Sequence, residues 1–520
     1  MQQDSNNKRR SLLKSGLVVS FFTMLSRVFG LTRDIVIANF IGASAGADAF
    51  FVAFKIPNFL RRLFAEGAFA QAFVPVLSEY RESGDPKKLR ELINHVAGVL
   101  GLVLLVITVI AMLAAPLLAW LFAPGFYADS AKMALTTDML RITFPYLILI
   151  SLTGFAGSIL NSFGRFAAPA FTPILLNISL IGCALFAAPL LEQPVMALAW
   201  GVLLAGFLQL LFQLPFLYAI GMVPKPRFKP QDEGVKKVAK LMIPALFGVS
   251  VSQINLLLDT ILASFLITGS VSWLYYSDRL VELPLGVIGI AIATVILPSL
   301  SRIHARKQGD HFSSTLDWAL RLIVLIGIPA ATALVVLAKP LITTLFQYGE
   351  MTSNDVEKIS GSLQAYSLGL LAFMLIKVLA PGYFSRQDTK TPVKIGIKAM
   401  VANMVFNLAL IVPFAHVGLA LATSLSAWLN AYWLYAGLRK QGVYNPAADW
   451  VSILCKIALA TLAMGFVLWF GSHEMGDWQA WSWFERSWRL AVLCCSGLGV
   501  YLLVLLATGV RPHQFVQQTH

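Results

Sequence analysis

The chain has 520 residues, of which 58% are hydrophobic and only 13% charged, and its formal net charge is +14. Soluble domains average about 25% charged residues, and the mean hydropathy here is +0.74, so the composition excludes a water-soluble protein. The basic residues lie in short loops between apolar runs and form no aromatic-interleaved patch, which excludes nucleic acid as a partner.

Apolar runs long enough to cross a bilayer recur along the chain. A hydrocarbon core of about 30 Å needs roughly 20 residues of helix, and the runs lack the two-residue alternation of a membrane-spanning strand. We therefore expect an all-α polytopic membrane protein with fourteen transmembrane helices. The expected helices cover residues 12–40, 47–80, 92–122, 136–162, 168–190, 194–221, 238–267, 271–301, 316–347, 360–385, 393–413, 416–438, 449–471 and 487–510.

Lysine and arginine are concentrated in alternate loops. About 19 lie in the loops of one side and about 3 in those of the other, and loops rich in basic residues stay in the cytoplasm. Both termini are therefore predicted to be cytoplasmic. The first apolar run carries charged residues and has no cleavage-like end, so it is predicted to be a retained helix and not a signal peptide.

Part of the sequence occurs twice. The segment AAPLLAWLFAPGF at 114–126 matches AKPLITTLFQYGE at 338–350, displaced by 224 residues, and FVPVLSEY at 73–80 matches ILPSLSRI at 296–303 at nearly the same displacement. Helices 1–6 are therefore expected to repeat as helices 7–12. Because each unit has an even number of spans, the two lobes should be related by an axis along the membrane normal, around a central cavity suited to alternating access.

The repeat also predicts the domain organisation. Two six-helix lobes are joined by a basic cytoplasmic linker, and the last two helices lie outside the repeat. The predicted parts are a cytoplasmic tail (1–11), the N-terminal lobe (12–222), the linker (223–237), the C-terminal lobe (238–440), helices 13 and 14 (441–510) and a C-terminal cytoplasmic tail (511–520).

Three expected spans carry charged residues in their interiors. Each such residue costs about 2.5–3.5 kcal/mol at the centre of a bilayer, so we expect them to face a wet or protein-lined cavity. The alternative is that they pair with one another to hold the bundle together, or reach the interface from near the helix ends. The residues are Arg27, Arg33 and Asp34 in the first span, Asp48, Lys55, Arg61, Arg62 and Glu66 in the second, and Asp278, Arg279 and Glu282 in the eighth.

The type of charge indicates the type of substrate. Arginine offers a planar fork of donors that binds phosphate in a bidentate manner and stays charged in a low dielectric. A cavity containing Arg27, Arg33, Arg61 and Arg279 is expected to bind an anionic, phosphate-bearing headgroup whose lipid tail stays in the bilayer. Walker, GxSxG and HExxH motifs are absent from the sequence, so we do not expect an enzyme.

The charged spans lie in segments that resemble a known family. The sequence SRVFGLTRDIVIANFIGASAGADAFFVAFKIPNFLRRLFAEGAFAQAFVPVLSEY at 26–80 resembles the N-terminal signature of the MurJ (MviN) family. SVSWLYYSDRLVELPLGVIGIAIATVILPSLSR at 270–302 and APGYFSRQDTKTPVKI at 380–395 resemble two further family blocks. The resemblance covers essentially the whole chain and implies the fold of the multidrug/oligosaccharidyl-lipid/polysaccharide flippase superfamily.

The resemblance also implies a function and a location. The implied function is to carry lipid II, the undecaprenyl-diphosphate-linked peptidoglycan precursor, from the inner to the outer leaflet of the bacterial cytoplasmic membrane. The implied partners are lipid II, the bilayer and the cell-wall synthesis machinery. Helices 13 and 14 would form a groove for the prenyl tail, with plain packing or insertion support as the alternative.

Individual residues receive roles from the same resemblance. No cofactor is expected beyond sodium or membrane-potential coupling, and oxygen ligands for sodium would come from Asp259 with Asn403 or Asn407. The alternative for Asp259 is a lone carboxylate, hydrogen-bonded or protonated. The implied substrate-binding residues are Arg27, Arg33, Arg61 and Arg279, with Asp34, Asp48, Asn58, Glu66 and Glu282 supporting the cavity.

Three other functions compete with this one. A cation-coupled multidrug exporter should carry acidic sites for cationic substrates, so four arginines argue against it. A flippase for another prenyl-diphosphate glycan would need the same phosphate-binding arginines, and only the family blocks disfavour it. A scaffold protein of the cell-wall machinery would not need the charged stripes.

Overall fold

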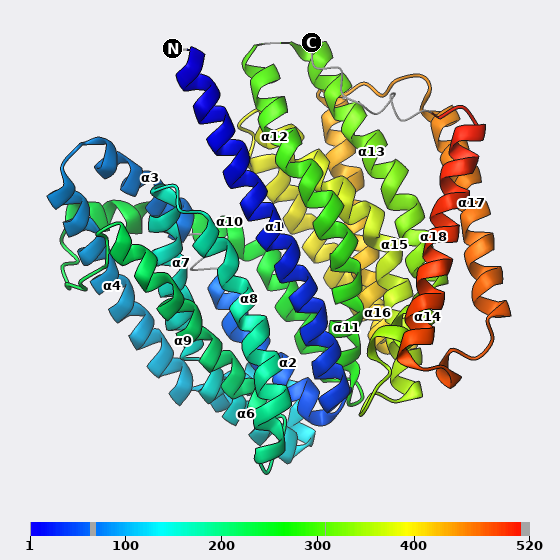
Figure 1. Ribbon diagram of the computed structural model, residues 1–520, viewed down its shortest axis with the longest axis horizontal. Coiled ribbons are helices and arrows are strands. Elements are labelled where there is room, and N and C mark those ends of the chain that lie inside the picture. Colours follow the sequence, from blue (N-terminus) through cyan, green and yellow to red (C-terminus); the bar gives the residue numbers. More distant parts are fainter. Residues whose placement is uncertain (1, 63–68, 307, 511–520) are drawn as a thin grey trace. The chain divides into compact units, whose positions relative to one another are not determined.

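Helices account for all the regular structure in the part of the chain that the structure describes. The computed structural model describes residues 2–62, 69–306 and 308–510, and the expected all-α fold is confirmed over these residues (Figure 1). Contacts within the chain divide it into two units, unit 1 (Met1–Val271) and unit 2 (Ser272–His520). Each unit is described by itself below.

Unit 1 contains the helices that the first seven expected spans predict. Local sequence explains several of their ends: the Asp85 carboxylate accepts hydrogen bonds from the first amides of α4, and Pro86 takes the first helical position. Its elements are α1 (Gln2–Ile41), α2 (Ala45–Arg61), α3 (Phe69–Glu82), α4 (Pro86–Leu113), α5 (Ala115–Phe122), η2 (Pro124–Ala128), α6 (Ser130–Thr143), α7 (Tyr146–Ser162), α8 (Ala167–Gly182), η3 (Cys183–Ala187), η4 (Ala188–Leu190), α9 (Met196–Ala219) and α10 (Glu233–Ser264).

Unit 2 takes in most of α11, which begins at the end of unit 1, and the remaining helices. α16 consists of two helices that meet at a kink, where Ala415 has the non-helical angles φ 49° and ψ −128°, between two expected spans. The elements are α11 (Ser270–Pro284), η5 (Leu285–Gly289), α12 (Ile290–Ala305), α13 (Gly309–Val336), α14 (Ala338–Phe346), α15 (Ser353–Phe384), α16 (Lys390–Lys440), α17 (Trp450–Glu474), η6 (Trp478–Ala480) and α18 (Trp483–Ala507).

Nine helices of the described residues are long and apolar enough to cross a membrane. One of them, α16, covers two of the expected spans, 393–413 and 416–438. The four expected spans that fall on α1, on α2 and α3, on α10, and on α11 and α12 do not meet the same criterion over the described residues. A multi-pass membrane protein is thus established, and the count of fourteen spans stays a prediction.

The sequence repeat has a counterpart in the backbone. α4 gives way to α5 at Ala114, with φ −85° and ψ 8°, and α13 gives way to α14 at Leu337, with φ −92° and ψ 13°. The two short helices end at Phe122 and Phe346, which are displaced by the same 224 residues as the sequence match. The repeated sequence therefore produces the same helix break twice, while the predicted lobe boundaries stay a prediction.

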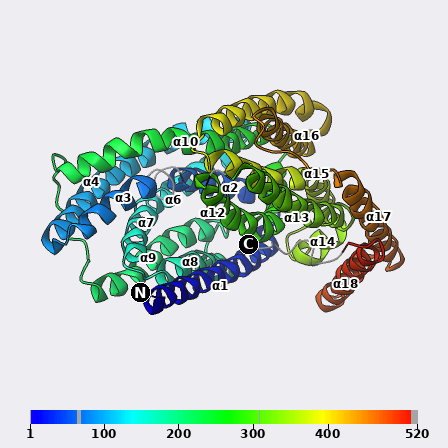
Figure 2. The ribbon, with the colours of Figure 1, turned by 90° about the horizontal axis from the view of Figure 1, so that it is seen from above.

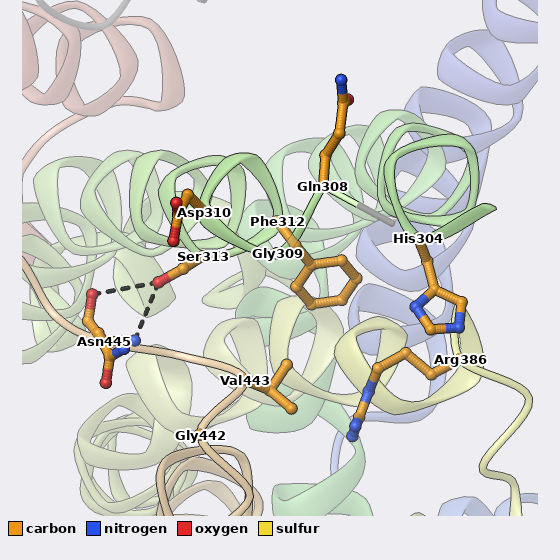
Figure 3. Close-up of a pocket in the computed structure, with 10 residues that line it drawn as sticks. All are labelled: His304, Gln308, Gly309, Asp310, Phe312, Ser313, Arg386, Gly442, Val443 and Asn445. Atoms are coloured by element: carbon orange, nitrogen blue, oxygen red, sulfur yellow. Dashed lines mark hydrogen bonds between the residues drawn. The ribbon is translucent and has the colours of Figure 1, made fainter. Parts of the chain in front are cut away.

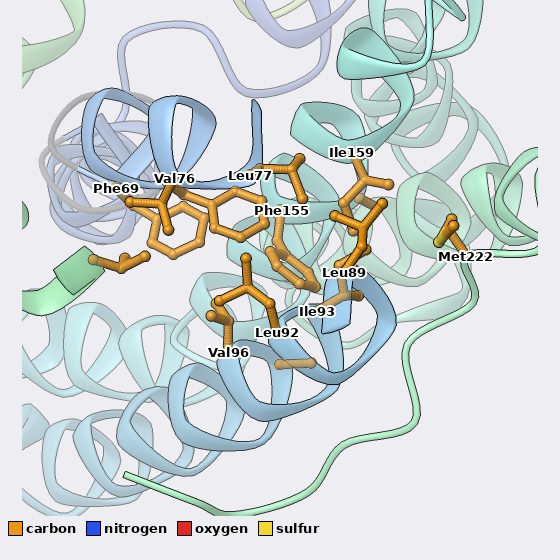
Figure 4. Close-up of a cluster of buried hydrophobic side chains, with 14 of the residues drawn as sticks. Phe69, Val76, Leu77, Leu89, Leu92, Ile93, Val96, Phe155, Ile159 and Met222 are labelled. Carbon is orange, nitrogen blue, oxygen red and sulfur yellow. The ribbon is translucent and has the colours of Figure 1, made fainter. Parts of the chain in front are cut away.

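The core of unit 1 at one end is an aromatic and aliphatic cluster between α3, α4 and α7 (Figure 4). The rings of Phe73 and Phe155 lie 5.0 Å apart between centroids, and both side chains are buried. Leu89, Ile93 and Met222 close the cluster from α4 and from the chain that follows α9. Dense packing of this kind holds the ends of the three helices in one arrangement.

The predicted cytoplasmic linker lies along α4. The Asn94 side chain accepts a hydrogen bond from the Lys225 amide at 2.7 Å, and the Asn94 carbonyl accepts one from the Arg227 amide at 3.0 Å. His95 Nδ1 lies 3.0 Å from a carboxylate oxygen of Asp232, the residue that caps α10. The linker is therefore docked on the N-terminal part of α4 and connects it to the start of α10.

Loops that were predicted to share a side of the membrane do lie together within each unit. In unit 1, Arg81 donates to the carbonyl of Ser162, and Arg90 donates to the carbonyl of Gly221 at 2.8 Å. These contacts join three loops that were all predicted to be cytoplasmic. The predicted alternation of spans is thus consistent with the fold of unit 1, and the side on which the termini lie stays a prediction.

Helices α17 and α18, outside the repeat, lie side by side and are fastened to unit 2 (Figures 1 and 2). At one end, Arg321 of α13 donates to Asp317 at 2.6 Å and to both carboxylate oxygens of Asp449 at 2.9 and 2.5 Å, which lowers the pKa of Asp449. At the other end, the buried Arg486 donates to the carbonyls of Thr343 and Gln347, at 3.2 and 3.3 Å, near the end of α14. Charged groups therefore hold these helices against unit 2 at both ends.

Gly98 tests the docking of the linker. A Cβ atom added at Gly98 would lie 2.4 Å from the carbonyl carbon and oxygen of Arg227, so Gly98→Ala should push the linker off α4. Arg227 is the only tryptic site in residues 223–232, because Lys225 and Lys229 precede prolines. We expect trypsin to cut the purified variant after Arg227 several-fold faster than the parent protein. Gly101→Ala, where nothing lies within 4 Å, is the matched control and should be cut at the parental rate; equal rates for all three proteins would contradict the docked linker.

Candidate functional site

Arg33 and Asp34 form a buried pair in α1. The Arg33 Nε and Nη2 atoms donate to one carboxylate oxygen of Asp34 at 2.9 and 2.6 Å, and Nη1 donates to the Asn177 side chain at 3.1 Å. Asn177 in turn donates to the carbonyl of Ser26 at 3.1 Å, so the group joins α1 to α8. Arg33 is 3% exposed and its charge is balanced by Asp34. In this arrangement Arg33 stabilises the packing of two helices.

Arg27 is different from the other predicted arginines. It lies in the same apolar helix and is half-buried, and among the described residues it has no hydrogen-bond or ion-pair partner. Asp34, seven residues further along α1, is already paired with Arg33. An uncompensated guanidinium within an apolar span is costly, so among the predicted substrate-binding arginines of unit 1, Arg27 is the one whose charge is most available to an anion.

Arg61 lies at the last turn of α2 and is half-buried. Its Nε donates to the Asn58 side chain at 3.0 Å, as the expected support by Asn58 requires, and it makes further contacts. Lys55 is half-buried on the same helix. Glu66, the other predicted support in this span, lies outside the described residues.

Asp48 is paired with a lysine that the sequence analysis assigned to a loop. Its Oδ2 atom accepts from Lys132 Nζ at 2.8 Å and from the Gly269 amide at 2.8 Å. The Lys132 ammonium also lies 4.0 Å from the centroid of the Phe126 ring. Asp48 and Lys132 are 1% and 5% exposed. Asp48 therefore joins α2, α6 and the turn before α11 within unit 1, and its cation is a lysine.

Arg279 is the predicted arginine of unit 2. Its Nη1 donates to Glu282 at 2.6 Å, and its guanidinium lies 5.4 Å from the centroid of the Tyr275 ring. Both charged side chains are partly exposed, at 30% and 40%. Arg279 therefore pairs with Glu282, and the pair retains access to ligand or water.

The residues suggested for sodium are divided between the two units. Asp259 is half-buried in α10 of unit 1. Asn403 and Asn407 are fully buried in α16, where the Asn407 amide donates to the Asn403 side chain at 3.0 Å. Within the described residues, no group of three or more histidines, cysteines or acids is placed to hold a metal ion. Asn403 also donates to Thr423 and Ser426 at 3.4 Å, across the bend at Ala415, so the asparagines already have a packing role, and sodium binding stays a prediction.

Two partners in these networks were not identified from the sequence. Asn177 is a polar residue inside an apolar run, and such residues are rare enough to have marked it as a candidate. Lys132 gave no such signal, because it precedes its apolar run and counts as an ordinary loop residue. Its partner Asp48 is 84 residues away, beyond the reach of helical spacing rules.

The pair between Asp48 and Lys132 predicts a strong stability effect. Lys132→Met should leave a buried carboxylate without its cation and lower the stability by about 3–5 kcal/mol. The double variant Asp48→Asn with Lys132→Met removes both charges and should recover much of that loss. Thermal unfolding in detergent and the amount of protein in membranes measure the effect. A double variant no more stable than Lys132→Met would show that the pairing does not explain the burial of Asp48.

Comparisons with known proteins identify the family. A family model described as lipid II flippase MurJ matches residues 37–488. The chain is 52% identical over 507 residues to a probable lipid II flippase MurJ of Haemophilus influenzae, covering 95% of this chain and 99% of that protein. It is 42% identical over 464 residues to the lipid II flippase MurJ of Burkholderia cenocepacia, covering 88% and 90%.

Solved structures agree with the sequence relatives. A lipid II flippase MurJ in an inward closed conformation is similar with a TM-score of 0.79 and 28% identity, over 94% of this chain and 98% of that one. An inward-facing multidrug transporter of the MATE family, in the MOP superfamily, shares the fold with a TM-score of 0.69 at 14% identity, over 82% and 98%. With the family model and the relatives spanning nearly its full length, the chain belongs to the lipid II flippase MurJ family.

Proposed function

We propose that this protein carries lipid II from the inner to the outer leaflet of the bacterial cytoplasmic membrane for peptidoglycan synthesis. The observation that carries the proposal is the 52% identity, over 95% of the chain, to a relative named as a probable lipid II flippase. The helical fold with apolar spans and internal charges supports the same function. Delivery of the precursor to the enzymes that polymerise it would place the protein near the cell-wall synthesis machinery.

The diphosphate of the substrate requires cationic partners that are not already neutralised. Arg27 meets this requirement because it is half-buried and has no partner among the described residues. In unit 2, Arg279 is already paired with Glu282, and both side chains are partly exposed. Arg33 contributes indirectly, since its bonds to Asp34 and Asn177 hold α1 against α8. Cationic residues that bind the diphosphate are compatible with alternating access, because they compensate the substrate's negative charge while the cavity changes the side to which it opens.

The charge of the substrate also predicts a driving force. Each net negative charge moved outward against a negative cytoplasm gains about 2.3 kcal/mol per 100 mV of membrane potential. If cationic side chains such as Arg27 neutralise the headgroup, the same field acts on the return of the empty carrier. Either case makes the transport cycle sensitive to the potential.

The direct test of the function is depletion of the protein in growing cells. An impermeant enzyme that degrades lipid II on the outer surface should find less substrate, while lipid II accumulates in the inner leaflet. Unchanged lipid II on both sides, with accumulation of another prenyl-diphosphate glycan, would instead assign the protein to that substrate.

Replacing Arg27 should lower transport activity, whereas replacing Arg33 should lower the amount of protein in the membrane. Arg27→Ala should abolish transport at normal membrane abundance, because among the described residues Arg27 has no hydrogen-bond or ion-pair partner to lose. Arg27→Lys should retain part of the activity, since an ammonium carries the charge without the bidentate fork. Arg33→Ala should instead reduce abundance, because it leaves Asp34 buried without its cation. Membrane protein and surface lipid II are measured in the same cells; normal transport by Arg27→Ala would refute its role as a phosphate ligand.

The orientation is tested by labelling. In a variant without native cysteines, a cysteine at Gln231 in the linker should resist an impermeant thiol reagent in intact cells, and a cysteine at Gln479 between α17 and α18 should react. Both side chains are exposed, so reagent access depends on the side of the membrane. Labelling at Gln231 with protection at Gln479 would reverse the predicted topology.

A further inference from the structure

Unit 2 contains a pocket of about 420 Å³ at the ends of its helices (Figure 3). Three chain segments form it: the end of α12 with the start of α13, the residues after α15, and the loop between α16 and α17. All three were predicted to lie on the cytoplasmic side. The lining residues are His304, Gln308, Gly309, Asp310, Phe312, Ser313, Arg386, Gly442, Val443 and Asn445.

One part of the pocket is basic. Arg386 is fixed by bonds from its Nε to the Gly382 carbonyl at 3.0 Å and from Nη2 to the Gln441 side chain at 2.6 Å. Among the described residues, its Nη1 atom has no acceptor. Figure 3 shows the His304 ring beside the aliphatic part of the Arg386 side chain, with the guanidinium pointing away from the ring, and the His304 ring lies 6.5 Å from the Phe312 ring between centroids. The guanidinium is thus held in place with donors still available.

The start of α13 adds to the positive potential. Among the described residues, the first amide of this helix that bonds back is that of Phe312, which donates to the Gln308 carbonyl at 3.0 Å, and Gln308 provides no side-chain cap. Gly309 and Asp310, in the preceding turn, line the pocket. Unsatisfied amides at a helix start favour an anion, and here they accompany a cavity and a fixed arginine.

The remaining part of the pocket is suited to hydrogen-bond donors. Figure 3 shows Asp310 and Asn445 away from Arg386 and His304. Ser313 is engaged with the Asn445 backbone, accepting from its amide at 2.9 Å and donating to its carbonyl at 3.2 Å, which fixes this loop. The Asp310 carboxylate is therefore placed to accept from a hydroxyl or ammonium group of a ligand.

We propose that this pocket binds the headgroup of a membrane phospholipid, a phosphodiester whose alcohol carries hydrogen-bond donors. Arg386 and the first turn of α13 hold the phosphate, and Asp310 accepts from the glycerol or ethanolamine group. The location agrees, because phospholipid phosphates lie at the depth where spanning helices end, and basic pockets between such helices bind lipid headgroups. The site is separate from the transport of lipid II and does not depend on it.

The test measures lipid retained by the purified full-length protein, by native mass spectrometry after exchange into nanodiscs of known composition. Phosphatidylglycerol and phosphatidylethanolamine should be retained, and phosphatidylcholine, whose trimethylammonium group cannot donate, should not. Gly309→Asp places a carboxylate among the helix amides, where a Cβ meets nothing within 4 Å, and should reduce retention on the order of tenfold. An acidic residue in the first turn also stabilises a helix, so this variant should fold.

Matched variants separate binding from folding. Gly309→Ala adds a Cβ without charge and should retain lipid as the parent does. Arg386→Gln should lose retention, and Arg439→Gln, which removes an exposed arginine outside the pocket lining, should not. Equal retention of phosphatidylcholine, or full retention by Gly309→Asp, would overturn the proposal. Inorganic phosphate could also stabilise the protein against heat as much as phosphatidylglycerol does, with the effect lost in Gly309→Asp. That result would assign the pocket to free phosphate and also overturn the proposal.

Discussion

The structure depends on the cost of placing charge inside helices that cross a low-dielectric layer. A charged group there must be paired, reach water or bind a ligand. In the described residues, Arg33 is paired with Asp34, Lys132 with Asp48 and Arg279 with Glu282. These pairs contain five of the eleven charged residues that the sequence places in the three charged spans, and the pair of Asp48 with Lys132 also joins α2 to α6. Arg27 has no such partner among the described residues, so we infer that its charge binds a ligand.

The same constraint explains how helices outside the repeat are attached. Between apolar helices in lipid there is little hydrophobic driving force, so packing and polar contacts decide association. α17 and α18 pack on α13 through Ile457, Met464 and Tyr501, and the Tyr501 hydroxyl donates to the Leu325 carbonyl at 2.6 Å. With charged networks at both ends, the pair is a fixed part of unit 2. Support by packing, one of the two roles expected for these helices, therefore has a physical basis.

Much of the fold could be predicted because hydropathy and charge act locally. Apolar runs fix where helices lie, and the repeat at 114–126 and 338–350 fixes two matching breaks. The pairing of Arg279 with Glu282 follows from their spacing of three residues. The partners of Asp48 and Arg33 could not be predicted, since Lys132 and Asn177 are distant in sequence and their proximity results from helix packing. The sequence therefore identified the charged residues that are costly to bury in a membrane span, and the structure identified which of them have an ion-pair or hydrogen-bond partner.

The two cationic features at Arg27 and Arg386 use the same chemistry in different surroundings. Arg386 lies at a helix end, where water screens its charge, so a bound phosphate gains little from each contact and exchanges readily. Arg27 lies within a span, where a lower dielectric strengthens its attraction for a phosphate. A transporter must nevertheless release what it binds. The single guanidinium of Arg27 permits release. When the cavity opens to the outer side, water that reaches Arg27 would weaken the contact between its guanidinium and the substrate phosphate.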